Sequence, residues 1–155
     1  MHKTNKLNFS SLHIPKNATL IKTPIALNWL DENGFVCSIS NDSIPTIENF
    51  RLHFQMISDL CEGEKRPFLV DPSLAKPLTV LQRKFVDEMI NKHLASVAFI
   101  TQNTMMRMGV NLFFKMRSRN IPMRMFADEA SAREWLHEIE GKKKSMNSRS
   151  EAYSF

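Results

Sequence analysis

The chain has 155 residues, which is the usual size of one domain and enough to bury a single hydrophobic core. Its formal charge is +5 at pH 7, but the excess of basic residues lies in Met1–Lys22 and Gly141–Phe155. The segment between them, Thr23–Glu140, holds 13 basic and 15 acidic residues. This near-neutral balance argues against a basic nucleic-acid-binding face on the folded domain.

The N-terminal segment, residues 1–20, is polar and lysine-bearing, and we expect a flexible arm. A domain is expected at residues 21–140. It opens with two runs of alternating apolar residues on either side of a turn that starts at Asp31 and contains Asn33-Gly34. Asn-Gly between such runs predicts an antiparallel β-hairpin.

A helix is predicted next, with Thr46 as its N-cap and Gly63 as its stop. Apolar residues recur there at spacings of three and four, which is typical of one buried helical face. The apolar positions are Ile47, Phe50, Phe54, Ile57 and Cys61. The polar face is expected to hold Glu48, His53, Gln55, Asp59 and Glu62.

Three short apolar runs in the rest of the domain predict parallel strands covered on both faces. They are Pro67–Asp71, Ser96–Thr101 and Ile121–Phe126. Helices are predicted after each run. The first begins at a Thr79–Gln82 capping box, the second covers Met105–Met116, and the third runs from Asp128 to Gly141. Residues 141–155 are expected to form a disordered basic tail.

The predicted order is β-β-α-β-α-β-α-β-α. Strands that alternate with helices need crossover connections, which are right-handed in nearly all proteins, so the later strands are expected to form a parallel sheet. The first hairpin adds an antiparallel edge. The fold class is therefore α/β, with one mixed sheet in one domain.

The loop after Pro67–Asp71 places an acid and two hydroxyls, Asp71, Ser73 and Thr79, where open α/β sheets bind ligands. A phosphate on Thr79 would be stabilised by the helix N-terminus and would change the charge of the surface. The simpler interpretation is structural. Thr79 caps the helix, and Asp71 and Ser73 form a turn with Pro72.

The helix predicted at Met105–Met116 is unusually rich in methionine. Its expected inward stripe consists of Met105, Met108, Leu112, Phe113 and Met116. This leaves Met106 and one face of Phe113 or Phe114 as surplus apolar surface, which suggests an interaction surface for self-association. Core filling is the alternative interpretation of the stripe.

No catalytic or metal-binding motif is present in the sequence. The four glycines form no phosphate loop and no nucleophile elbow, and the histidines show no HxxH or HExxH spacing. Cys37 and Cys61 have no CxxC spacing and are expected to be reduced, buried thiols. We expect no enzyme activity, no metal and no cofactor.

Three stretches, IALNWLDENGFVCSIS, KRPFLVDPS and MRMFADEASAREWLHEI, resemble a group of small bacterial STAS-like proteins, distant relatives of anti-sigma-factor antagonists. The resemblance covers roughly Ile21–Ile139. It implies a mixed sheet with helices packed mainly on one side, used for protein–protein contacts. In typical STAS antagonists a kinase phosphorylates a hydroxyl within an Asp-Ser-Ser-Gly pattern. The matching place here reads Pro77-Leu78-Thr79-Val80, without glycine.

The leading hypothesis is a non-enzymatic, cytoplasmic regulatory module that binds another protein, including a second copy of itself as a homodimer. No specific nucleic acid is expected as a partner, because the folded segment is nearly neutral. No membrane insertion is expected either, because no stretch approaches the roughly 20 apolar residues of a membrane span. The alternative is a small-ligand-binding protein or an unrecognised enzyme. It would use the strand ends near Asp71, Thr101, Gln102 and Asn103.

Overall fold

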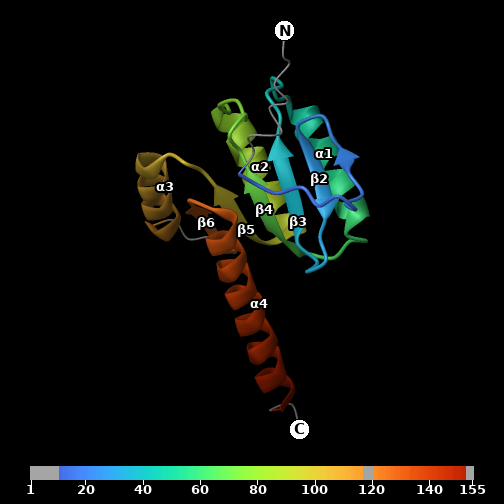
Figure 1. Ribbon diagram of the computed structural model, residues 1–155, viewed down its shortest axis with the longest axis vertical. Coiled ribbons are helices and arrows are strands. Elements are labelled where there is room, and N and C mark those ends of the chain that lie inside the picture. The colour runs from blue at the N-terminus through green and yellow to red at the C-terminus, as the bar shows by residue number, and fades with distance from the viewer. Residues whose placement is uncertain (1–10, 117–120, 153–155) are drawn as a thin grey trace.

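The computed structural model describes residues 11–116 and 121–152, without the side chains of Val110 and of residues 112–116 and 148–152. One mixed sheet and four helices make up this part of the chain (Figure 1). The strands are β1 (Ile21–Lys22), β2 (Ala26–Leu30), β3 (Val36–Ser40), β4 (Arg66–Asp71), β5 (Leu94–Ile100) and β6 (Met123–Phe126). The helices are α1 (Ile47–Leu60), α2 (Val80–His93), α3 (Thr104–Met116) and α4 (Glu129–Ala152).

The six strands lie side by side in sequence order. β1, β2 and β3 pair antiparallel, whereas β3, β4, β5 and β6 pair parallel. The predicted α/β class and the predicted element order are confirmed. The short strand β1 is an addition, because two residues are too few to show an alternating pattern.

The hairpin between β2 and β3 depends on Gly34. Its N–H donates to the carbonyl of Asp31 at 3.1 Å, and its φ is +78°, which is the left-handed region that glycine adopts without a steric penalty. A Cβ at this position would lie 2.7 Å from Arg66 Nη1. The Asp31 side chain completes the turn, since its Oδ1 accepts from the N–H groups of Asn33 and Phe35 at 2.9 Å each.

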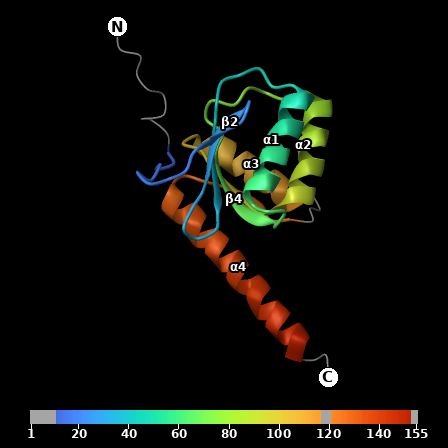
Figure 2. The same ribbon diagram turned by 90° about the vertical axis from the view of Figure 1, so that its right-hand side faces the viewer.

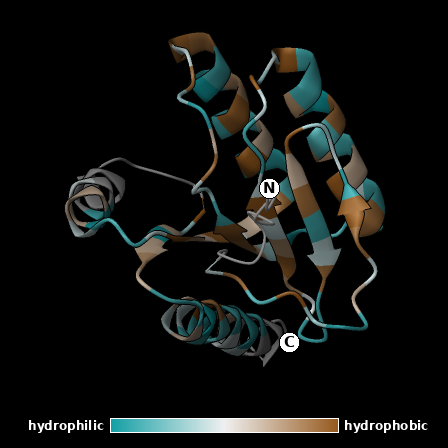
Figure 3. Ribbon diagram, turned by 45° about the horizontal axis from the view of Figure 1, so that its top comes forward, coloured by the Kyte–Doolittle hydropathy of each residue, from teal (hydrophilic) through white to brown (hydrophobic). Residues whose placement is uncertain are grey.

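Helices cover both faces of the sheet. Figures 2 and 3 show α1 and α2 together on one face and α4 on the other. The buried core under α1 and α2 consists of Val36, Phe50, Phe54, Ile57, Cys61, Phe68, Ile90, Leu94 and Val97. The buried core under α4 consists of Leu12, Trp29, Phe35, Cys37, Ile39, Leu69, Ala98, Ile100, Ala132 and Leu136. The expected one-sided packing therefore describes α1 and α2, but not α4.

α3 stands beside the edge strand β6 (Figure 3). It is held there by the side chain of Asn111, whose Oδ1 accepts from the N–H of Met125 at 2.7 Å and whose Nδ2 donates to the Met125 carbonyl at 3.0 Å. The prediction that Met105 and Met108 point inward was wrong, since they are 86% and 71% exposed. The physical reason is that this helix packs beside a strand edge, which covers only one side of it.

α4 continues past Gly141, where the sequence predicted its end. Residues 141–152 are helical in the structure and form no separate tail. Lysines follow Gly141 directly and favour the helix intrinsically, and Lys143 Nζ donates to the Ala95 carbonyl at 3.1 Å. The second half of α4 projects away from the sheet (Figure 1).

Candidate functional site

Asp71 ends β4 and is buried, at 2% exposure. Its Oδ1 accepts hydrogen bonds from the N–H and the hydroxyl of Ser73, and its Oδ2 accepts from the N–H of Ser11 at 3.0 Å. The structure therefore brings Asp71 and Ser73 together, as the predicted turn requires. The Asp71 carboxylate holds the turn and, in addition, holds the N-terminal segment against the sheet.

The neighbouring strand end also contacts Ser11. Gln102 Nε2 donates to Ser11 Oγ at 3.2 Å and to the Ala127 carbonyl at 3.0 Å. Asp71 and Gln102 therefore both form hydrogen bonds with Ser11. Leu12 follows Ser11 and is buried in the core under α4. The N-terminal segment of the same chain therefore covers the carboxyl ends of β4 and β5.

Thr101 and Asn103 serve the start of α3. Thr101 Oγ1 accepts from the N–H of Asn103 at 3.3 Å, and Asn103 Oδ1 accepts from the N–H of Met106 at 3.0 Å. These side chains accept hydrogen bonds from backbone N–H groups at the helix N-terminus, as capping residues do.

Thr79 is the N-cap of α2. Its Oγ1 accepts from the N–H of Gln82 at 3.2 Å, while Gln82 Oε1 accepts from the N–H of Thr79 at 3.0 Å. This is the predicted capping box. Gln82 Nε2 also donates to the Pro45 carbonyl at 2.9 Å, which ties the start of α2 to the loop before α1.

A cavity of about 250 Å³ lies between the sheet and the helices α1 and α2, and we call it the α1–α2 cavity. Its floor includes Ser38, Val70 and Phe99. The loops before α1 and α2, at residues 41–46 and 72–79, contribute to its rim. It therefore lies under the predicted Asp71–Thr79 loop. The contacts of Asp71 with Ser11 show that the carboxylate is directed toward the core under α4, on the other face of the sheet.

His53 lines the α1–α2 cavity and is 5% exposed. The prediction that it lies on the polar face of α1 was wrong. It is three residues after Phe50 and four before Ile57, so it shares their buried face. Its Nδ1 is 2.7 Å from Thr23 Oγ1, and burial lowers the pKa of the imidazole to about 4. His53 is therefore neutral at pH 7.

Both cysteines are free and buried. Burial, together with the nearby Asp31 carboxylate, raises the pKa of the Cys37 thiol to about 12. Burial also raises the pKa of Cys61. A thiol is nucleophilic only as the thiolate, so neither sulfur is activated for covalent chemistry at neutral pH.

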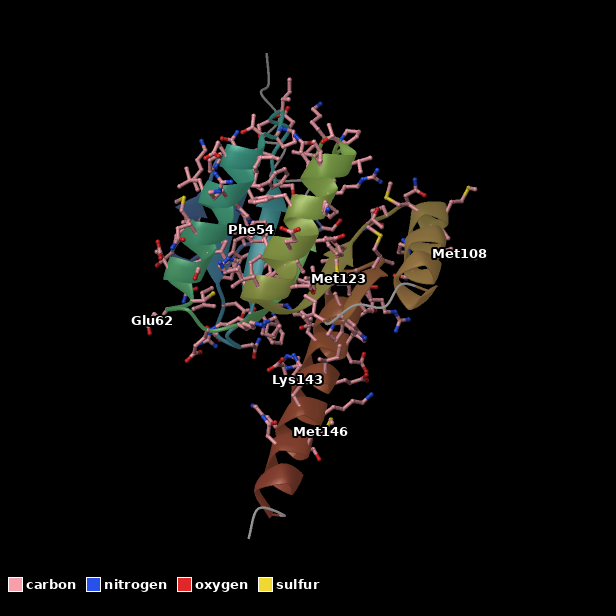
Figure 4. The ribbon with its side chains drawn as sticks, turned by 180° about the vertical axis from the view of Figure 1, so that it is seen from behind. Phe54, Glu62, Met108, Met123, Lys143 and Met146 are labelled. Carbon is pink, nitrogen blue, oxygen red and sulfur yellow. The ribbon has the colours of Figure 1, made fainter. Side chains whose placement is uncertain are left out.

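The exposed surface of α3 carries three methionines, Met105, Met106 and Met108, and we call them the methionine patch. Figure 4 shows α3, with Met108 labelled, standing apart from α1 and α2. A groove beside it is lined by residues of α3, β6 and α4, including Arg124, Glu134 and Trp135. Met106 was predicted on this surface, while the side chains of Phe113 and Phe114 lie outside the described part of the chain.

Membrane insertion and metal binding each have a simple structural requirement. Within residues 11–116 and 121–152, none of the helices has the length and apolar character needed to cross a bilayer. The same part of the chain has no cluster of three or more His, Cys, Asp or Glu side chains that could share a metal ion.

The α1–α2 cavity and the burial of His53 were not found from the sequence. Two signals were available. Ser38 and Ser40 are polar residues on one face of β3, and His53 occupies a position with core spacing on α1. Neither signal gives the distance between the two helices and the sheet, so neither predicts a cavity.

A family model described as a domain of unknown function, DUF7793, matches residues 27–140. The chain belongs to this family. A search of curated proteins found no match to this DUF7793 chain.

Two solved structures are similar to the DUF7793 chain. The first is an uncharacterised protein of the DUF3478 family with a SpoIIAA-like fold from Shewanella loihica PV-4, with 14% identity and a TM-score of 0.51 over 80% of this chain and 99% of that chain. The second, a protein with unknown function from Arthrobacter sp. FB24, has 18% identity and a TM-score of 0.25 over 80% of this chain and 96% of that chain. The first match confirms the STAS-like fold.

Proposed function

We propose that this DUF7793 domain is a non-enzymatic, cytoplasmic regulatory module that binds a second copy of itself through the methionine patch. The observation that carries the proposal is the exposure of Met105, Met106 and Met108, at 86%, 49% and 71%. Single exposed apolar residues are normal, but three exposed methionines within four positions give this helix an unusually apolar surface, and Met105 and Met108, at i and i+3, share one side of it. Methionine is well suited to such a surface, because its flexible thioether adapts to different neighbours.

Charge complementarity supports a second copy as the partner. The groove beside the patch has Arg124 on β6, and Glu134 and Glu138 on α4, all exposed. A two-fold interface places the same surface on both sides, so a surface with both signs of charge can pair with itself. Trp135, half-buried in the groove and 5.5 Å from the Phe126 ring, offers an apolar seat for methionine side chains.

The chemistry of the described candidate groups supports a non-enzymatic role. Among the described candidates, the Asp71 carboxylate accepts three hydrogen bonds from the chain, and the two cysteine thiols have raised pKa values. Free thiols are also typical of proteins in a reducing compartment, which supports a cytoplasmic location.

Sedimentation velocity at micromolar protein concentration tests the self-association. The double variant Met105→Lys/Met108→Lys places two charges in the patch, and we expect it to be monomeric where the wild type is dimeric. Met146→Lys is the matched control, because Met146 is also exposed, at 69%, but lies on the projecting half of α4. A monomeric wild type, or a dimer unaffected by the double variant, would contradict the proposal.

Phosphorylation of Ser73 or Thr79 is a subordinate part of the proposal. Both hydroxyls lie in the loop between β4 and α2, where added phosphate would alter the surface near the N-terminus of α2. Phosphopeptide mapping of protein isolated from its native cell tests it. Complete absence of phosphate at both positions under all growth conditions would remove this part.

A further inference from the structure

The floor of the α1–α2 cavity is a row of residues from three parallel strands. Ser38 pairs in register with Val70, and Val70 pairs with Phe99, so their side chains share one face of the sheet. Val70 and Phe99 belong to central strands and are nevertheless only half-buried. The next row, two residues earlier in each strand, is Val36, Phe68 and Val97, and all three are buried. The open space therefore lies toward the carboxyl ends of the strands.

The walls of the cavity come from both helices. α1 contributes Phe50, His53 and Phe54, and α2 contributes Val86 and Ile90. Figure 4 shows Phe54 where α1 and α2 lie next to each other over the sheet. The interior is thus mostly apolar, apart from Ser38 and Ser40 of β3 and a histidine whose pKa is lowered to about 4. Such an interior accepts hydrocarbon and disfavours a charge.

The mouth has a different chemistry. Among the described residues that line the cavity, Lys76 is the one cation, and none is acidic. Lys76 is exposed and lies in the loop between β4 and α2. On the opposite rim, Ser43 donates to Asn41 Oδ1 at 2.6 Å, and Asn41 Nδ2 donates to the Pro24 carbonyl at 3.1 Å. These bonds fix the rim, and Lys76 is the charged side chain among the described residues that line the cavity.

We infer that the α1–α2 cavity binds a free, medium-chain fatty acid, with its alkyl chain between the helices and the sheet and its carboxylate at the mouth beside Lys76. A volume of about 250 Å³ suits a chain of roughly ten heavy atoms. The apolar walls favour the chain, the neutral interior keeps the carboxylate out, and the lysine attracts it to the rim. This site is independent of the methionine patch, which lies on α3.

The probe is decanoate, kept below the concentration at which it associates with itself, with 1-decanol as its uncharged analogue. Binding is measured on the full chain by isothermal titration calorimetry and by ¹⁵N-HSQC shifts. We expect decanoate to bind and to shift the amides of residues that line the cavity. Ser38→Leu adds apolar volume at the floor, and we expect it to abolish binding of both probes while the protein remains folded.

Lys76→Gln keeps the test decisive even if the core variant does not fold, because Lys76 is exposed. We expect it to weaken decanoate binding roughly two- to five-fold, as for a partly screened surface ion pair, and to leave 1-decanol binding unchanged. Lys92→Gln, an exposed lysine on α2 that does not line the cavity, is the matched control.

Several results would overturn the inference. They are the absence of decanoate binding by the wild type, undiminished binding by a folded Ser38→Leu variant, and equal loss of decanoate affinity in the Lys76 and Lys92 variants. Binding to anionic phospholipid vesicles without binding to monomeric decanoate would also overturn it, in favour of a membrane surface. None of these results bears on the dimer formed through α3, whose test is the sedimentation experiment.

Discussion

Arg133 Nη1 on α4 lies 2.6 Å from Asp31 Oδ2 in the turn between β2 and β3. The same guanidinium donates through Nε to Glu129 Oε1 at 2.9 Å, and Glu129 Oε2 accepts from the N–H of His13 at 2.9 Å. One arginine therefore connects the hairpin, α4 and the N-terminal segment. The Asp31 side chain is only 6% exposed, so this ion pair is little screened by solvent.

Replacing Arg133 with methionine should lower the free energy of unfolding by about 3 kcal/mol, because a nearly buried carboxylate loses its cation. Urea unfolding measures the change. Arg51→Met is the control, since Arg51 pairs with Glu48 at an exposed position of α1 and should cost less than about 1 kcal/mol. Equal effects of the two substitutions would show that the Asp31–Arg133 pair does not hold α4 to the hairpin.

The stability of the domain should fall in acid partly because of His53. Burial lowers its pKa from the ordinary 6.5 to about 4 in the folded state, so protons bind more tightly to the unfolded chain. The contribution of His53 is therefore complete above pH 6.5 and is lost as the pH falls toward 4, by about 3 kcal/mol in total. Urea unfolding of wild type and His53→Gln at pH 7.0 and 4.5 isolates this part. The variant should lose less stability on acidification, and a parallel loss in both proteins would refute the assignment.

Gly34→Ala should destabilise the domain by about 1–3 kcal/mol. The new Cβ would sit at a φ of +78° and would meet Arg66 Nη1. Gly141→Ala is the matched control, because a Cβ there meets open space on a helix. It should stabilise the protein by up to about 1 kcal/mol. Thermal unfolding of both variants gives the comparison, and a loss of stability in Gly141→Ala would mean that α4 does not continue as a helix there.

Thr79→Ala should cost about 1 kcal/mol, because the hydroxyl no longer accepts from the N–H of Gln82. Thr79→Asp should keep most of the stability, since aspartate is also a good N-cap. Denaturant titration of the two variants distinguishes a capping role from a purely regulatory one. If alanine and aspartate were equally harmless, the capping box would contribute nothing to folding.

Local patterns in the sequence predicted most of the fold. Asn33-Gly34 predicted the hairpin, the continuous apolar runs predicted the parallel strands, and Thr79 with Gln82 predicted the start of α2. Each of these depends on residues close together in the chain, where backbone preference and capping chemistry decide the outcome. The pairing of Asp71 with Ser73 was predicted for the same reason.

The incorrect predictions concern contacts between distant parts of the chain. Met105 and Met108 have core spacing, but α3 meets only the edge of the sheet, and its position follows from the Asn111–Met125 contact. His53 is polar, yet Thr23, thirty residues earlier, provides its buried hydrogen bond. Helical periodicity identifies the apolar face of a helix, but it does not show which element packs against that face. For the same reason, it did not predict the α1–α2 cavity.

The contact between Asn111 and Met125 has a consequence for solubility. A side-chain amide occupies the position at β6 where a further strand would otherwise bond, so the backbone of Met125 is not offered to other chains. The unpaired N–H and C=O groups of an uncovered edge strand are a template for pairing with another chain, which leads to aggregation. Asn111→Leu would remove both hydrogen bonds to Met125. We expect this variant to aggregate in a concentration-dependent way under conditions in which it is still folded.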